Sequence, residues 1–189
     1  MSLLTISLLL SIIAIATYFQ TVTGFGLAMI VIGVVSGFQL SSVAFIATVV
    51  SIISLINSGV ALRGQLHHIN WSLAKVTLFG IIPSSVLGVI LLNYLSQQAS
   101  SVLELSLGLV IAYSGIRFAF RPKQRQSISN SMSFFNAGFL SGLTGGLFAM
   151  PGPPIIFHMY RQPMSLLMIR YMLLLIFSVT ALSRTVMKL

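Results

Sequence analysis

The chain reads Thr23-Gly-Phe-Gly-Leu-Ala-Met29 near its start and Thr144-Gly-Gly-Leu-Phe-Ala-Met150 in its second half, and both segments interrupt apolar stretches. Glycine frees the backbone from regular helix geometry, and lipid cannot satisfy the amide groups that are released. Such breaks persist in membranes mainly where they line a polar cavity or a substrate site. The related pair predicts two broken helices and favours a transporter. The alternative is that these small residues only let helices pack closely.

The composition indicates an integral membrane protein. Of the 189 residues 57% are hydrophobic and 6% are charged, and Glu104 is the single acidic residue. A soluble domain would carry far more charge on its surface. Uncharged runs at residues 1–62, 76–103 and 126–157 each exceed the roughly 20 residues that cross a bilayer. No basic residue precedes the first apolar run, so we expect a membrane helix there rather than a cleaved signal peptide.

The basic residues indicate topology rather than nucleic acid binding. The formal charge is +9, but these residues lie mostly at the ends of apolar runs and not on one face or tail. By the positive-inside rule, the loops around His67 and Lys123 are cytoplasmic. The uncharged loop at Gln97 is then outside.

The apolar pattern predicts an all-α fold, a polytopic transmembrane helical bundle with two repeats that each contain a broken helix. We assign residues 1–120 to the first repeat and 121–189 to the second, which is incomplete relative to the first. Charge parity favours one net crossing for each broken helix, which places Arg161 outside and both Arg184 and Lys188 inside. Two parallel repeats would also place the N-terminus in the cytoplasm. The expected helices cover residues 3–19, 27–35, 41–62, 72–94, 102–120, 133–143 and 164–187.

Residues 138–160, which include Met150-Pro-Gly-Pro-Pro154, are followed by Arg170 in the next helix. This pattern resembles the second-repeat motif of the sulfite exporter TauE/SafE family, and Thr23-Gly-Phe-Gly26 resembles the first-repeat motif. The resemblance spans most of the chain. It implies a multi-pass transporter of the bacterial inner membrane that moves small sulfur-containing anions such as sulfite or organosulfonates. The family typically has seven or eight spans, whereas about six are predicted here.

The breaks supply most of the candidate substrate-binding residues. A helix that restarts after a glycine presents free amides and the positive end of its dipole, which together bind anions. Glycine also lets a substrate approach the backbone. Glycines spaced four residues apart, as at 138 and 142, instead favour helix packing. The predicted substrate-binding residues are Thr23, Gly24, Gly26, Thr144, Gly145, Gly146, Gly152, His158 and Arg170.

Arg170 and His158 carry the ionisable part of this prediction. Arg170 lies inside the last apolar stretch, where a charge is costly and usually functional. It either meets the substrate anion, reaches the outer headgroups, or pairs with Glu104. His158 titrates near neutrality and can carry a proton or meet an anion, although an interfacial role is the alternative. No metal site or cofactor is predicted, because His67 and His68 lack further ligand residues.

Other classes of function are less consistent with the sequence. An enzyme needs placed acids, bases or nucleophiles, but Asp is absent and Glu104 stands alone. We therefore predict that the chain is not an enzyme. A noncatalytic membrane subunit that docks a partner through small-residue helix faces stays open as an alternative. The predicted partners are a small anionic substrate and the lipid bilayer, with a homo-oligomer left open and nucleic acid excluded.

Overall fold

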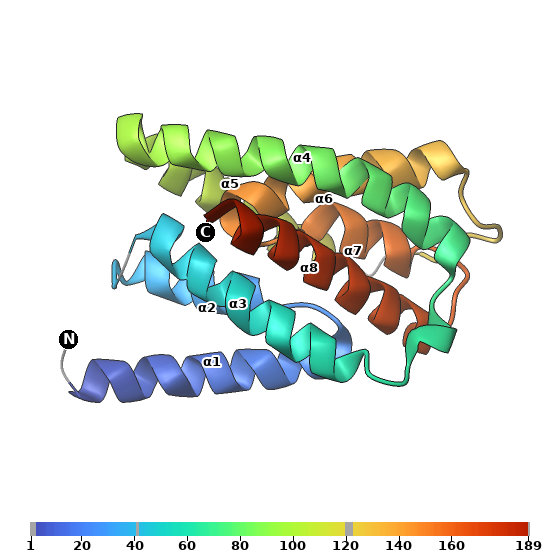
Figure 1. Cartoon of the computed structure of the whole chain (residues 1–189), viewed down its shortest axis with the longest axis horizontal. Helices are drawn as coiled ribbons and strands as arrows, with labels where there is room; N and C mark the ends of the chain where they lie inside the picture. Colours follow the sequence, from blue (N-terminus) through green and yellow to red (C-terminus); the bar gives the residue numbers. More distant parts are fainter. Residues whose placement is uncertain (1–2, 41, 120–122, 189) are drawn as a thin grey trace.

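The computed structural model describes residues 3–40, 42–119 and 123–188, and regular structure within them is helical. The helices form an elongated bundle along one common direction (Figure 1). Four of the described helices, α1, α3, α4 and α8, are long and apolar enough to cross a membrane. The predicted all-α polytopic membrane bundle is confirmed. The elements are α1 (Leu3–Thr23), α2 (Leu27–Gly37), α3 (Val43–Ala61), the 3-10 helix η1 (Leu66–His68), α4 (Trp71–Gln98), α5 (Ser100–Ala119), α6 (Ser131–Phe148), α7 (Pro153–Tyr160) and α8 (Leu166–Lys188).

Helices α4 and α6 pack backbone against backbone through glycine. A Cβ atom at Gly138 would lie 2.5 Å from the Thr77 carbonyl oxygen, and one at Gly142 would lie 2.5 Å from the Ile81 carbonyl oxygen. Any side chain at these two positions would therefore overlap α4. The packing interpretation of this glycine pair fits the structure, because small residues allow the close approach that stabilises helix pairs in lipid.

The second broken helix, α6–α7, returns to the end of the bundle from which it starts. The Arg125 amide donates to the Arg161 carbonyl at 2.8 Å, and the Ser129 amide donates to Gln162 Oε1 at 2.9 Å. These bonds join the loop before α6 to the turn after α7, so the two helices form a hairpin. With eight residues, α7 is only about 12 Å long, too short to complete a crossing. The predicted single crossing of this broken helix, with Arg161 outside, is therefore wrong. The prediction counted only a few charges and did not consider how short α7 is.

Helix α8 starts at the same end as that hairpin. The His68 ring stacks on the Tyr171 ring with centroids 5.4 Å apart, so η1 lies beside the first turns of α8. We call the end that carries η1, the loop before α6 and the turn after α7 the basic end. From there α8 runs toward the opposite end (Figure 1). Arg184 and Lys188, in its C-terminal part, therefore lie toward the opposite end. If the basic end is cytoplasmic, their predicted placement inside is wrong.

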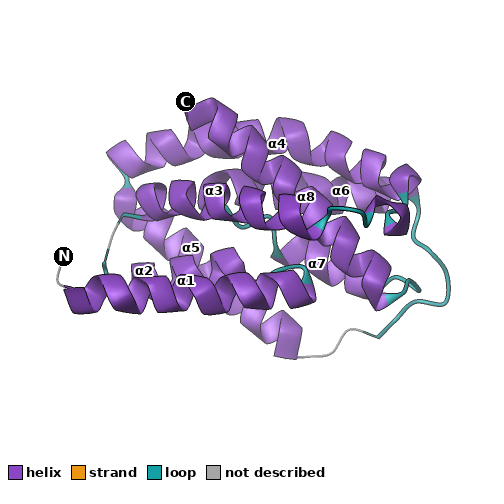
Figure 2. Ribbon diagram, turned by 60° about the horizontal axis from the view of Figure 1, so that its bottom comes forward, coloured by secondary structure: helices purple, strands orange, loops and turns teal. Residues whose placement is uncertain are grey.

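The first broken helix, α1–α2, enters the bundle from the opposite end. Both views place the start of α1, the end of α2 and the start of α3 far from the basic end (Figures 1 and 2). If the basic end is cytoplasmic, the start of α1 lies outside, so the predicted cytoplasmic N-terminus is wrong. That prediction assumed parallel repeats, whereas the two hairpins enter from opposite ends.

We expect Lys123 and Arg161 to lie on the same side of the membrane and Gln97 on the other. The chain has no cysteine, so single cysteines at these positions report their own exposure. An impermeant maleimide added to intact cells should label Gln97→Cys alone, because the positive-inside rule makes the basic end cytoplasmic. Labelling of Arg161→Cys without Lys123→Cys would contradict the α6–α7 hairpin.

Candidate functional site

The first break covers Gly24 to Gly26, between α1 and α2. Gly24 has φ +88° and Gly26 has φ +112°, backbone conformations that a Cβ atom makes strained. Thr23 Oγ1 donates to the Phe25 carbonyl at 2.8 Å and so holds the turn. The Gly26 carbonyl accepts the first backbone bond of α2, which leaves the amides of residues 27–29 without a partner inside the helix. The start of α2 is therefore suited to an anion.

The second break lies further along the chain than the repeated motif predicts. Helix α6 continues through Phe148, so Thr144, Gly145 and Gly146 are helical, and the unwound segment is residues 149–152. These glycines permit close packing, because a Cβ atom at Gly146 would overlap the Ser85 carbonyl of α4 and one at Gly145 would lie 2.7 Å from Thr180 Cγ2 of α8. The prolines that follow set the break instead. The two motif copies thus occupy different structures.

The two restarting helices differ in the donors they offer. Pro153 and Pro154 open α7 and have no amide hydrogen. The next amide, that of Ile155, donates to Ser141 Oγ at 2.8 Å. Helix α7 therefore contributes mainly the positive end of its dipole. Free amides for a ligand come from α2.

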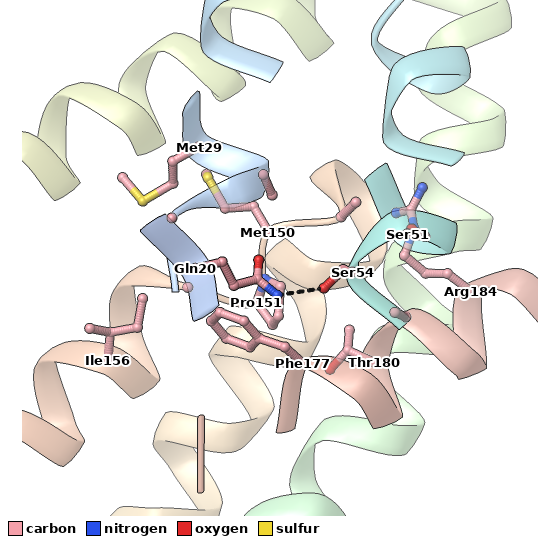
Figure 3. A pocket seen from close by; sticks show the side chains of 15 residues that line it. Gln20, Met29, Ser51, Ser54, Met150, Pro151, Ile156, Phe177, Thr180 and Arg184 are labelled. Atoms are coloured by element: carbon pink, nitrogen blue, oxygen red, sulfur yellow. Dashed lines mark hydrogen bonds between the residues drawn. The ribbon is translucent and has the colours of Figure 1, made fainter. Parts of the chain in front are cut away.

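A pocket that contains several buried polar side chains, which we call the central pocket, lies between the two breaks (Figure 3). It is bounded by the end of α1, the start of α2, the middle of α3, the second break, the start of α7 and the C-terminal half of α8. The centre of a water-sized sphere can move through about 20 Å³, which is room for about one water molecule. A larger ligand would require the pocket to widen. Its buried polar side chains are Gln20, Ser51, Ser54, Thr180 and Arg184.

Arg184 is the one charged side chain among the described residues that line the central pocket. It is 1% exposed. Its Nε donates to Ser51 Oγ at 3.0 Å, and Nη1 donates to the Gly145 carbonyl at 3.0 Å and also to the Gly146 carbonyl. Those carbonyls belong to the last turn of α6, where carbonyl oxygens have no N–H partner within the helix. Nη2 is buried without a hydrogen-bond partner in the described part of the chain. A buried guanidinium with a free donor and no acidic neighbour suits an anion.

A row of buried hydroxyl groups extends from Arg184 along α3. Ser51, Ser54 and Ser58 are three and four residues apart, so they lie on one face of the helix. Gln20 Nε2 donates to Ser54 Oγ at 3.1 Å and to Ser58 Oγ at 3.4 Å. This face runs from the central pocket toward the basic end. We call it the α3 polar track, and it provides buried hydrogen-bonding groups along α3.

The central pocket brings together only part of the predicted set. Gly26 and Gly152 line it, and Gly145 and Gly146 contact Arg184 through their carbonyls. Thr23 and Gly24 form part of the first break but do not line the central pocket. Thr144 Oγ1 is bonded to carbonyls of its own helix, at 3.3 Å and 3.1 Å.

Arg170 and His158 lie outside the central pocket. Arg170 is about 21 Å from Arg184 along α8. A Cβ atom at Gly24 would lie 2.9 Å from the Arg170 carbonyl oxygen, so Arg170 adjoins the first break. Glu104 lies in the first turns of α5, at the end opposite to Arg170, and the two form no ion pair among the residues described. The alternative that Arg170 pairs with Glu104 is therefore wrong. His158 packs edge-on against Phe134, with ring centroids 4.6 Å apart, near the basic end.

Arg184 is not among the predicted site residues. The sequence indicates a topology role for it, because an uncharged run ends at Ser183. One more turn of α8 follows Arg184, up to Lys188, so Arg184 lies inside the helix rather than at its end. This extra turn is the sequence feature that could have identified Arg184 as a site residue.

These features define a polytopic α-helical membrane protein with a polar pocket between two broken helices, an arrangement found in secondary transporters. The model of the sulfite exporter TauE/SafE family matches residues 9–188, and the chain belongs to that family. A probable sulfite/organosulfonate exporter TauE of Cupriavidus necator is 50% identical over 169 residues, which cover 89% of this chain and 66% of the relative. The chain thus spans about two thirds of that relative's length. No solved structure matches the chain.

Proposed function

We propose that the chain is a membrane transporter that carries small sulfur-containing oxyanions, such as sulfite or organosulfonates, through the central pocket. The observation that carries this proposal is the buried Arg184 with its unpartnered Nη2. A guanidinium presents planar, paired donors that match the oxygens of a sulfite or sulfonate group. The free amides at the start of α2 add further donors.

The hairpins suggest how such a site reaches both sides of the membrane. They enter from opposite ends of the bundle, and their broken tips meet at the central pocket (Figures 1 and 3). Movement of one hairpin against the rest would open the pocket to one side at a time, as in alternating access. The α3 polar track and Arg170 would line the way toward the basic end. Residues 1–120 and 121–189 as two repeats stay a prediction.

We also propose the membrane in which this transport takes place. The membrane would be the inner membrane of a bacterium, in keeping with the Cupriavidus necator relative. Transport would proceed without catalysis, in keeping with the family and with the exporter that is 50% identical to this chain. Association of identical copies stays open.

Binding of sulfite to the purified chain tests the proposed substrate class. We expect sulfite and methanesulfonate to raise the melting temperature in detergent in a saturable way, because a ligand that binds only the folded state stabilises it by about 2.7 kcal/mol at 100 times its Kd. Choline chloride at equal ionic strength is the control for general salt effects. Equal shifts with choline chloride would contradict a specific oxyanion site.

A further inference from the structure

A second feature, separate from the central pocket, lies between α5 and the α6–α7 hairpin. It is an apolar channel that opens into a basic mouth, and we call it the lateral groove. Neither part shares a lining residue with the central pocket. The channel and the mouth are continuous because both are lined by Tyr113, Arg117, Leu140, Pro154 and Phe157.

Among the residues that the structure describes, three arginines converge on the mouth of the lateral groove. The Arg117 guanidinium carbon lies 4.0 Å from the centre of the Phe157 ring, and that of Arg161 lies 5.6 Å from the same ring. Arg125, which also lines the mouth, donates from Nη1 to Ser129 Oγ at 2.8 Å. Aromatic contacts hold the guanidiniums in place but do not neutralise them.

No acidic side chain of this chain can balance these charges. Glu104 is the single acidic residue, and it precedes Arg117 by about 20 Å along α5. That distance exceeds the Debye length of about 8 Å at physiological salt. The guanidiniums at the mouth are therefore open to an anionic group from outside the chain.

The rest of the lateral groove is apolar and faces sideways. Leu140 is 54% exposed although it lies in the middle of α6, and Leu143 and Pro153 continue the same wall. The centre of a water-sized sphere can move through about 250 Å³ of this channel. A soluble anion would use only the mouth and leave this apolar surface uncovered. An amphiphile with an anionic head would cover both.

We propose that the lateral groove binds an anionic phospholipid, with its phosphate between Arg117 and Arg161 and an acyl chain along Leu140 and Leu143. By the positive-inside rule the basic end faces the cytoplasm, so the phosphate would lie at the level of the cytoplasmic headgroups. Basic pockets between membrane helices on the cytoplasmic side commonly take such headgroups. The lipid would join α5 to α7 at the point where Arg117 already stacks on Phe157.

Lipid retention by the purified full chain tests this site. Native mass spectrometry after detergent exchange should show phosphatidylglycerol bound in preference to phosphatidylcholine. The double variant R117Q/R161Q should weaken phosphatidylglycerol binding by roughly tenfold or more. The matched control R63Q removes an exposed arginine at the same end but outside the groove, and should bind phosphatidylglycerol normally. L140W fills the channel without changing charge, and should also lower retention.

Other outcomes would overturn the proposal. Equal retention of the two lipids, or equal loss in R63Q and in R117Q/R161Q, would show only general attraction to charge. Competition by millimolar inorganic phosphate, with no effect of L140W, would identify a site for soluble oxyanions. Displacement of lipid on formation of a stable dimer through this face would identify a second copy as the occupant. If R117Q/R161Q does not fold, L140W still decides the matter.

Discussion

Arg184→Gln is expected to abolish sulfite transport while part of the protein still reaches the membrane. The substitution removes the one charge that lines the described central pocket. Hydrogen bonds to charged groups contribute about 1.5 to 3 kcal/mol, so loss of the guanidinium should weaken anion binding by roughly tenfold to more than a hundredfold. The measurement is radiolabelled sulfite flux in proteoliposomes, normalised to the amount of inserted protein.

Two companion variants separate the charge of Arg184 from its structural bonds. Arg184→Lys keeps the charge but cannot reach Ser51 and both α6 carbonyls with one compact ammonium, so we expect reduced affinity and residual flux. Arg170→Gln removes an arginine outside the central pocket and should lower flux less than Arg184→Gln. If Arg184→Gln lowers the amount of protein in the membrane, the shift in melting temperature that sulfite causes in the purified variant is measured in place of flux. Normal flux or a normal sulfite shift in Arg184→Gln would contradict the assigned role.

Gly26→Ala is expected to reduce transport at least tenfold. Gly26 lines the central pocket and caps α2 at φ +112°. A Cβ atom there would lie 2.7 Å from Phe19 Cδ1, and the left-handed backbone would cost about 1–2 kcal/mol. Relief of that strain would turn the first amides of α2 away from the substrate. Flux in proteoliposomes and melting temperature are measured together.

Gly64→Ala is the matched control for backbone strain. Gly64 also has a positive φ, +74°, but nothing lies within 4 Å of its Cβ position. It follows α3 at the basic end, away from the central pocket. We expect a comparable or smaller fall in melting temperature with normal flux. If Gly26→Ala and Gly64→Ala transport equally well, the start of α2 does not take part in substrate binding.

Much of the fold follows from the sequence because lipid imposes simple rules. Long uncharged runs become helices, as with residues 76–103, which fall mostly within α4, and Gly24 and Gly26 break a helix where the motif indicates. Clusters of arginine and lysine mark segments that the structure gathers at one end. These features depend on local residue type, which the sequence displays directly.

The direction of each broken helix was harder to predict. Arg161 lies at the basic end because hydrogen bonds between Arg125 and Arg161, and between Ser129 and Gln162, close the α6–α7 hairpin. Such bonds join segments far apart in the sequence, and counting charges does not reveal them. The second break was misplaced for a similar reason. Gly146 lies inside a helix, where its lack of a side chain lets α4 pack closely against it.

The candidate site was predicted in outline but not in its central residue. The breaks identified Gly26 and Gly152, which line the central pocket. The sequence predicts Arg170 as the substrate ligand because it lies inside the last apolar stretch, and it indicates a topology role for Arg184 because an uncharged run ends just before it. Only the folded chain shows that Arg184 lies beside the breaks of both hairpins.

Flux of radiolabelled sulfite into proteoliposomes that contain only this chain is the most direct test of the transporter proposal. The account predicts saturable uptake that methanesulfonate inhibits, that choline chloride leaves unchanged, and that falls to the level of protein-free vesicles in Arg184→Gln. Uptake no greater than in protein-free vesicles, from protein that is folded and correctly inserted, would contradict it. That result would favour a noncatalytic membrane subunit that needs a partner.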